Sequence, residues 1–370
     1  MKQMTANSSE KWFRVVLFLC CIIWGSRVLA VEAAVKPEPL RVYYIGCSQI
    51  GSMLVDRLYS FFEQKGIHCD YGSTGGGGKT LTELWNSPKD KKIKVVANES
   101  NCPDGKGGWE PCKDQWNDPN PKRFGLYEQA FAKNTWDAVV MAPYNSRLHD
   151  DLTAGGKFIE LALKKSPKVK FYIFSWWSLR KVAPGGTWAG PSIPIDYQKA
   201  WLLTYAAGPE ATAWEAKNGW DSRDYYQKLC GHLNERYKKN AEPIKIIPAG
   251  EVIFELDKAI KAGTLPGLKA LFERSPKHLP GMTKDFKPSD GVNILYADTV
   301  HFSPPPHDFP SLGAFAGSMT IFSAISGKSP VGLSGATYGL DNTKDAELIA
   351  AIQEIVWKAV KEYSGIENLK

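Results

Sequence analysis

The stretch Leu40-Arg-Val-Tyr-Tyr-Ile-Gly-Cys-Ser48 decides the fold. Residues 40–45 are rich in β-branched and aromatic side chains, and a run of this kind predicts a buried strand. The strand ends at Gly46, and Ser48 follows directly, where its side chain can stand exposed at a turn from strand to helix. The stretch therefore predicts the first unit of an α/β protein, with a serine at the carboxyl end of its first strand.

Strand-like and helix-like stretches alternate along the rest of the chain. Further strands are predicted at residues 92–97, 136–141, 169–174 and 244–248. Helices are predicted at residues 53–62, 127–133, 158–165, 196–207, 221–239, 309–326 and 345–363. This alternation predicts a three-layer α/β/α sandwich with a central parallel sheet, whose active site lies beyond the carboxyl ends of the strands. No repeat or low-complexity linker interrupts residues 36–365, which are expected to form a single domain.

The first 30 residues have the pattern of a secretory signal peptide. Lys2 and Lys11 precede a short apolar run at residues 15–24, and the small-residue segment 28–30 resembles a cleavage site. The run is short for a membrane span, although an uncleaved N-terminal anchor is the alternative. We therefore expect a secreted or periplasmic protein with no further association with the membrane.

Charge and cysteine content narrow the classes of partner and cofactor. The chain carries a formal charge of +7, and removing residues 1–30, with four basic residues and one acidic residue, leaves +4. No basic stripe is present, so nucleic acid is a poor candidate partner. Cys102 and Cys112 flank a loop rich in glycine and, in an exported protein, are expected to form a disulfide. Zinc is disfavoured because no Cys-x-x-Cys or paired-histidine spacing occurs.

Asp298-Thr-Val-His301 is the second informative motif. A carboxylate three residues before a histidine can hold the imidazole in one tautomer, and a histidine is the usual base for a serine hydroxyl. If the fold brings this motif to Ser48, the three side chains form a nucleophile, a base and an orienting carboxylate. Taken separately, an Asp-x-x-His spacing is common by chance, and a serine after a strand is often a helix cap.

Two other motifs are excluded by their spacing. Gly46-Cys-Ser-Gln-Ile-Gly51 is not the Gly-x-Ser-x-Gly elbow of α/β-hydrolases, because its second glycine comes one residue late. The glycine run 75–78, followed by Lys79 and Thr80, lacks the first glycine of a phosphate-binding loop, since Ser73 stands there.

Five separated segments resemble the SGNH (GDSL-type) hydrolases, particularly bacterial members whose first block reads Gly-Asn-Ser. The segments are residues 45–48, residues 77–81 with Trp85 after them, residues 136–141, residues 298–303 and residues 326–333. The resemblance covers roughly residues 40–335, and it is most specific at Asp298–His301. It implies a flavodoxin-like α/β/α fold and an esterase that needs no metal or organic cofactor.

The resemblance also implies roles for individual residues. Ser48 would be the nucleophile, His301 the base and Asp298 its orienting carboxylate. The oxyanion hole would use the backbone amides of Ser48 and Gly78 and a side-chain amide of the third block, assigned to Asn145. Two departures from the family pattern occur: Cys47 replaces its Asp or Asn, and the third block reads Ala142-Pro-Tyr-Asn145 in place of Gly-x-Asn-Asp.

The tryptophans suggest a substrate class. Trp176, Trp177, Trp188 and Trp201 cluster near a strand end, and exposed indoles stack on sugar faces, whereas buried ones belong to the core. Trp177 and Trp188 are taken as substrate-binding residues. The sequence thus predicts a secreted serine esterase for a small-molecule or glycan ester, removing O-acyl (acetyl) groups from a carbohydrate. An acyltransferase with the same site, or a glycan-binding protein that has lost activity, are the alternatives.

Overall fold

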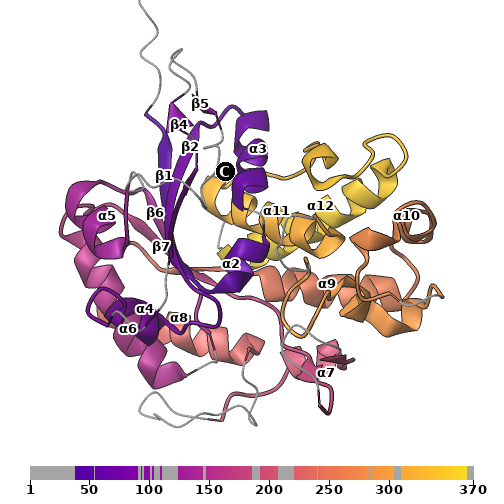
Figure 1. Ribbon diagram of the computed structural model, residues 1–370, viewed down its shortest axis with the longest axis horizontal. Helices are drawn as coiled ribbons and strands as arrows, with labels where there is room; N and C mark the ends of the chain where they lie inside the picture. The colour runs from indigo at the N-terminus through magenta and orange to yellow at the C-terminus, as the bar shows by residue number, and fades with distance from the viewer. Residues whose placement is uncertain are drawn as a thin grey trace, which may run out of the picture. The chain divides into compact units, whose positions relative to one another are not determined.

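A six-stranded sheet forms the centre of the described part of the chain (Figure 1). The computed structural model describes residues 38–53, 55–90, 93, 96–100, 102–103, 109–110, 124–144, 147–185, 192–206, 221–239, 241–282, 285–303 and 310–364. The sheet order is β10-β7-β6-β1-β2-β3. Its strands are β1 (Leu40–Gly46), β2 (Cys69–Gly75), β3 (Val96–Ser100), β6 (Ala138–Met141), β7 (Lys170–Phe174) and β10 (Lys245–Ile247).

Five of these strands are parallel, and β3 runs antiparallel to β2 at one edge. The chain builds the parallel part outward from β1, first to β2 on one side and then to β6, β7 and β10 on the other. This is the flavodoxin-like order, and its direction reverses between β1 and β6. In such sheets ligands bind beyond the carboxyl ends of the strands at the reversal point. The predicted three-layer α/β/α fold is confirmed, with the addition of one antiparallel edge strand.

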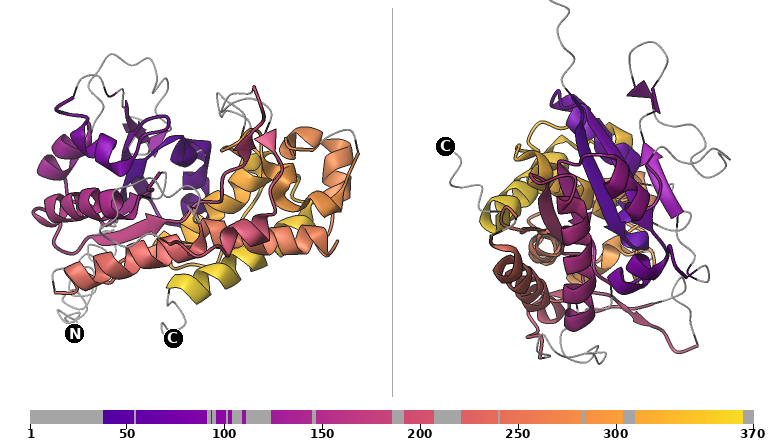
Figure 2. Two further views of the ribbon diagram at one scale, coloured as in Figure 1. Left: turned by 90° about the horizontal axis from the view of Figure 1, so that it is seen from below. Right: turned by 90° about the vertical axis from the view of Figure 1, so that its left-hand side faces the viewer.

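Helices cover both faces of the sheet (Figure 1). One layer consists of α4 (Leu81–Asn86), α5 (Tyr127–Lys133), α6 (Leu148–Leu163) and α8 (Arg223–Tyr237). In this layer α4, α5 and α8 each pack against α6. The other layer consists of α3 (Val55–Gln64), α9 (Ala249–Lys261), α11 (Leu312–Ser326) and α12 (Ala346–Ser364). Figures 1 and 2 agree that the early α3 and the late α11 lie side by side. Helices that are far apart in the sequence therefore pack together on one face of the sheet.

Shorter elements complete the described structure. They are α2 (Ser48–Ser52), α7 (Tyr197–Trp201), α10 (Leu268–Arg274), the hairpin of β4 (Cys102–Pro103) with β5 (Trp109–Glu110), the hairpin of β8 (Lys181–Val182) with β9 (Ser192–Ile193), and 3-10 turns at Pro276–His278, Pro288–Leu295 and Ala336–Tyr338. The described residues from Pro39 onward form one compact unit. Within them, no helix combines the length and the apolar character that crossing a bilayer requires.

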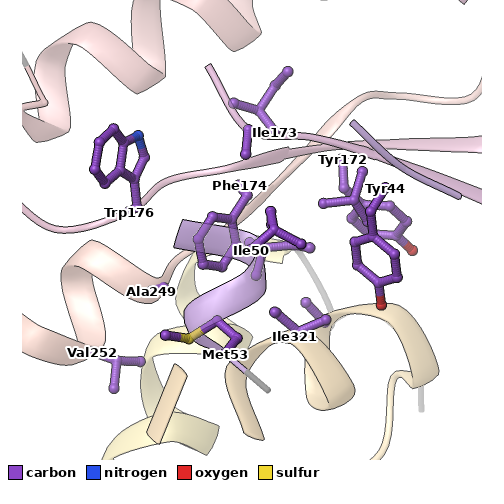
Figure 3. Close-up of a cluster of buried hydrophobic side chains, with 14 of the residues drawn as sticks. Tyr44, Ile50, Met53, Tyr172, Ile173, Phe174, Trp176, Ala249, Val252 and Ile321 are labelled. Atoms are coloured by element: carbon purple, nitrogen blue, oxygen red, sulfur yellow. The ribbon is translucent and has the colours of Figure 1, made fainter. Parts of the chain in front are cut away.

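The core next to the carboxyl end of β1 is built around α11, whose residues Leu312 to Ile325 are all buried. Figure 3 shows Ile50 and Met53, from α2 and the turn after it, among side chains of β7, α9 and α11. Gly317 of α11 makes room for Met53, because a Cβ at Gly317 would lie 2.3 Å from the Met53 sulfur. The Ser318 hydroxyl also donates a hydrogen bond to the Met53 carbonyl (2.5 Å). These contacts fix α2, and with it Ser48, on the core.

The predicted export depends on a signal peptide and is accompanied by a predicted disulfide. Cys47, Cys69 and Cys230 are buried thiols. Cys102 lies in β4, whereas Cys112, its predicted disulfide partner, lies outside the described residues. The predicted signal peptide, residues 1–30, also lies outside them.

Asp151 is a buried carboxylate that couples stability to pH. It lies on α6, where one oxygen accepts hydrogen bonds from the Tyr225 hydroxyl (2.5 Å) and the Arg147 amide (3.1 Å), and the other has no partner. Burial disfavours the charged form and raises the pKa of Asp151 to about 8, although those hydrogen bonds act in the opposite direction. The folded protein then binds a proton that the unfolded chain releases near pH 4, so stability falls as the pH rises from about 4 to about 8.

Replacing Asp151 with asparagine removes this penalty, because the amide oxygen can accept the same two hydrogen bonds without a charge. We expect Asp151→Asn to be more stable than wild type at pH 8 by on the order of 1–3 kcal/mol, with the difference shrinking toward pH 4. Urea unfolding at several pH values measures this. A difference that is independent of pH would contradict the assignment.

Candidate active site

Ser48 lies at the carboxyl end of β1, as the first residue of α2. The strand ends beside it are tightly packed, since a Cβ at Gly46 would lie 2.8 Å from the Cβ of Ala142, the residue that follows β6. The Ala142 amide donates to the Ile45 carbonyl (2.8 Å), which continues the pairing of β1 with β6 to the edge of the sheet. Glycine at position 46 therefore allows the chain to turn at the reversal point of the sheet and present Ser48 there.

His301 and Asp298 meet Ser48 at this edge, although 253 residues separate His301 from the serine. The His301 Nε2 atom lies 2.8 Å from the Ser48 Oγ atom, and the Nδ1 atom of the same ring lies 2.8 Å from an Asp298 carboxylate oxygen. The histidine side chain is 14% exposed and the aspartate side chain 2%. The three residues predicted from the sequence thus form one continuous chain of hydrogen bonds that is open to solvent at the serine end.

The Asp298 carboxylate is held in a single orientation. Its second oxygen accepts hydrogen bonds from the backbone amides of Val300 and His301, both at 2.6 Å. Burial acts to raise the pKa of Asp298, but the His301 side chain and these two amides outweigh it, and the pKa lies below its ordinary value. The carboxylate therefore stays ionised and accepts a hydrogen bond from the protonated Nδ1 atom of His301. In this tautomer Nε2 carries no proton and can accept the proton of Ser48.

The loop that carries His301 is braced by the segment after β7. The Trp177 indole N–H donates to the Val300 carbonyl (2.7 Å), and the indole stacks on Phe302 with ring centroids 3.9 Å apart. The Arg180 amide donates to the Thr299 carbonyl (2.9 Å). Trp177 is fully buried, so the expectation that it stacks on substrate is wrong: its ring stacks on Phe302 and its N–H is bonded to Val300, both in the loop that carries His301. No local feature of the sequence indicates this role.

Replacing Trp177 with phenylalanine leaves the buried Val300 carbonyl without its donor, next to His301. We expect a loss of about 1–3 kcal/mol in the free energy of unfolding and, because the histidine loosens, a fall of about tenfold in the rate of any reaction in which His301 acts as the base. Trp201→Phe is the matched control: it also removes an indole hydrogen bond, to Glu251 on α9 (2.7 Å), away from His301. Equal activity losses in the two variants would contradict the bracing role.

A glycine-rich turn follows β2 beside Ser48. Gly75 pairs with Gly46, the Gly76 amide donates to the Gly46 carbonyl (3.3 Å), and the Lys79 amide closes the turn on the Gly76 carbonyl (3.2 Å). Gly78 adopts φ +64°, a conformation that suits glycine. The turn therefore lies beside the end of β1, and the oxyanion role of the Gly78 amide stays a prediction.

Other predicted site residues fall in different places. Asn145 and Trp188 lie outside the described residues. Trp176 and Trp201 are buried in the core, at 0% and 1% exposure.

Cys47, at the departure from the family pattern, is buried and hydrogen-bonded to the Gln49 side chain, and burial raises the pKa of its thiol to about 12. It is therefore an inert neighbour of Ser48 and not a second nucleophile. In the described part of the chain, no cluster of three or more His, Cys, Asp or Glu residues could hold a metal ion.

Comparison with solved structures agrees with the fold. The structure is similar to a DUF4886 family protein from Bacteroides uniformis, with a TM-score of 0.51 and 13% identity over 87% of this chain and 95% of that chain. A second structure, from Slackia heliotrinireducens and described as "a putative SGNH hydrolase", aligns with a TM-score of 0.33 and 13% identity over 77% of this chain and 100% of that chain. The sequence matches no protein-family model and no curated protein.

Proposed function

We propose that the protein is a serine hydrolase of the SGNH type that acts on ester bonds. The observation that carries the proposal is the chain of hydrogen bonds from Ser48 through His301 to Asp298, at 2.8 Å for each step. A hydroxyl, an imidazole and an ionised carboxylate in this order are the parts that nucleophilic acyl transfer requires. Their position at the reversal point of a flavodoxin-like sheet adds support, because ligands bind there in such folds.

The reaction would proceed through an acyl-enzyme. The Ser48 oxygen forms a bond to the acyl carbon as its proton passes to His301 Nε2, and the carbonyl π electrons move onto the oxygen. Collapse of this intermediate breaks the bond to the leaving alkoxide, which takes the proton from His301. Water then attacks the acyl-serine by the same route, so that a carboxylic acid leaves and Ser48 is restored.

The oxyanion would be held by the backbone amides of Ser48 and Gly78, together with the Asn145 side chain. The turn at Gly76–Lys79 supports the Gly78 part of this proposal, because it follows the strand that pairs with the nucleophile strand. Donors aimed at the developing charge contribute roughly 3–4 kcal/mol each to lowering the barrier. No step in this cycle calls on a metal ion or an organic cofactor.

We extend the proposal to an O-acyl group, such as acetyl, on a carbohydrate, and to a protein exported by its N-terminal segment. Both rest on the sequence: the segment 1–30 resembles a signal peptide, and the tryptophan cluster suggests a sugar substrate. With Trp176, Trp177 and Trp201 buried, Trp188 is the member of the tryptophan cluster proposed to stack on a sugar.

The experiment that tests the proposal combines labelling with a substrate panel. A fluorophosphonate is expected to label the wild-type protein at one site, which peptide mass spectrometry assigns to Ser48. Acetate release from acetylated saccharides, compared with p-nitrophenyl acetate and with and without a saccharide acceptor, then identifies the substrate and separates hydrolysis from acyl transfer. A folded protein that neither reacts with the fluorophosphonate nor cleaves any ester would contradict the proposal.

A further inference from the structure

Tyr144 belongs to the same strand-end edge as Ser48, but the mechanism above gives it no part. It comes three residues after the end of β6, the strand that pairs with β1. The intervening Ala142 is in contact with the nucleophile strand through its amide, which donates to Ile45, and through the close approach of its Cβ to Gly46. The backbone therefore delivers the Tyr144 side chain to the reversal point of the sheet.

The Tyr144 ring is fixed in place. It stacks on Trp176, with centroids 5.6 Å apart and an interplanar angle of 21°. Trp176 is itself immobilised, because its indole N–H donates to the Pro143 carbonyl (2.8 Å) and its side chain is fully buried. A ring held in this way loses little further freedom when its hydroxyl engages a ligand, which is the preorganisation that an effective transition-state contact requires.

The neighbours of Tyr144 are the residues that flank the nucleophile. A Cβ built on Gly78 would lie 4.0 Å from the Tyr144 Cε1 atom, so the ring borders the glycine turn. The phenol also interacts electrostatically with Cys47, the residue directly before Ser48. None of the hydrogen bonds between described residues uses the Tyr144 hydroxyl, although the residue is only 7% exposed. The side chain thus offers a hydroxyl donor beside the glycine turn and near the residue that precedes Ser48.

We propose that the Tyr144 hydroxyl is a side-chain donor of the oxyanion hole, acting beside the backbone amides of Ser48 and Gly78. The inference rests on the proposed esterase function and adds a catalytic residue to it. As the Ser48 oxygen bonds to the acyl carbon and the π electrons move onto the carbonyl oxygen, the phenol O–H donates a hydrogen bond to that oxygen. The phenol proton is not transferred, so the balance of the acyl-transfer steps is unchanged.

The surroundings of Tyr144 keep its hydroxyl protonated. Burial raises the pKa of Tyr144 above its ordinary value, and the negative charges of Asp221 and Glu83 act in the same direction. A phenol that resists ionisation keeps its proton and remains a hydrogen-bond donor. Tyrosine hydroxyls serve as oxyanion donors in other enzymes, so the chemistry is within the reach of this side chain.

Tyr144→Phe tests the inference, because it removes the hydroxyl and keeps the ring that stacks on Trp176. We expect kcat for p-nitrophenyl acetate to fall about 10²–10³-fold with KM within about threefold of wild type. Binding of an alkylboronic acid, which forms a tetrahedral adduct on Ser48, should weaken by a similar factor. Tyr172→Phe, in the middle of β7 and equally buried, is the matched control and should retain wild-type values for both.

The outcomes separate this inference from the proposed function. If wild type is active and labelled at Ser48 while Tyr144→Phe keeps kcat within threefold, the oxyanion role is wrong and the esterase stands. A variant with raised KM, unchanged kcat and unchanged boronate affinity likewise overturns it, since the hydroxyl would then contact only the ground state. Wild-type protein without esterase activity overturns the proposed function itself. Thermal melting of each variant confirms that the comparison is between folded proteins.

Discussion

Replacing Ser48 with alanine is expected to lower kcat for ester hydrolysis by about 10⁴–10⁶-fold, the largest effect of any single substitution in this chain. In the proposed reaction the hydroxyl oxygen forms the covalent bond to the acyl group, and neither His301 nor the amides around it can replace it. The residual rate comes from binding and the oxyanion donors alone. Steady-state kinetics on p-nitrophenyl acetate and intact mass after fluorophosphonate treatment measure the loss.

Ser60→Ala is the control for this substitution. Ser60 lies on α3, where its hydroxyl donates to the Arg57 carbonyl (2.7 Å), and its removal should leave kcat and labelling unchanged. Both variants should remain folded, because Ser48 contributes its hydroxyl to His301 and not to the core. If Ser48→Ala keeps more than a tenth of the wild-type activity, another residue is the nucleophile.

Asp298→Asn is expected to lower kcat about 10⁴-fold. The amides of Val300 and His301 both point at one oxygen of residue 298, so the asparagine oxygen is retained there and its NH2 group is turned toward His301. His301 must then accept at Nδ1 and carry its proton on Nε2, where it cannot take the proton of Ser48. The variant should therefore fold with Ser48, His301 and residue 298 in place, but with the His301 imidazole in the wrong tautomer.

Two comparisons isolate this tautomer effect. Asp298→Ala removes the NH2 group and leaves the imidazole free to adopt either tautomer, so it should be no less active than Asp298→Asn. Asp341→Asn is the matched control, because Asp341 also accepts from two backbone amides, those of Thr343 and Lys344, outside the site. If Asp298→Asn retains wild-type kcat, the carboxylate does not orient the base.

The residues that the sequence identified share a local signal. Ser48 follows a strongly apolar strand, and Asp298 and His301 stand at a spacing that brings their side chains together within one turn. For this reason the triad and the strand positions at 136–141 and 169–174 could be predicted without knowing the tertiary structure. The structure brings the two segments to one edge of the sheet, as the prediction requires.

The elements that the sequence did not reveal depend on tertiary contacts. Strand β2 reads Cys69-Asp-Tyr-Gly-Ser-Thr-Gly75, a composition typical of turns, yet it is a buried strand because β1 and β3 pair with it on both sides. The strand predicted at residues 92–97 instead forms β3 at Val96–Ser100. Helix α9 was missed because it starts directly after the short strand β10, although Val252, Leu256 and Ile260 recur at helical spacing and could have indicated it.

The separation of the nucleophile from its base along the chain has a consequence for biosynthesis. Ser48 is synthesised early, but His301 reaches it only after the later segment has been synthesised and has docked at the end of β1. The packing of α11 against the end of α2 must also form. If the proposed function holds, a growing chain is therefore inactive for most of its translation. Ester cleavage would therefore require the whole domain to be folded. During refolding, activity should appear with the last step, when the His301 segment docks, and not when the sheet forms.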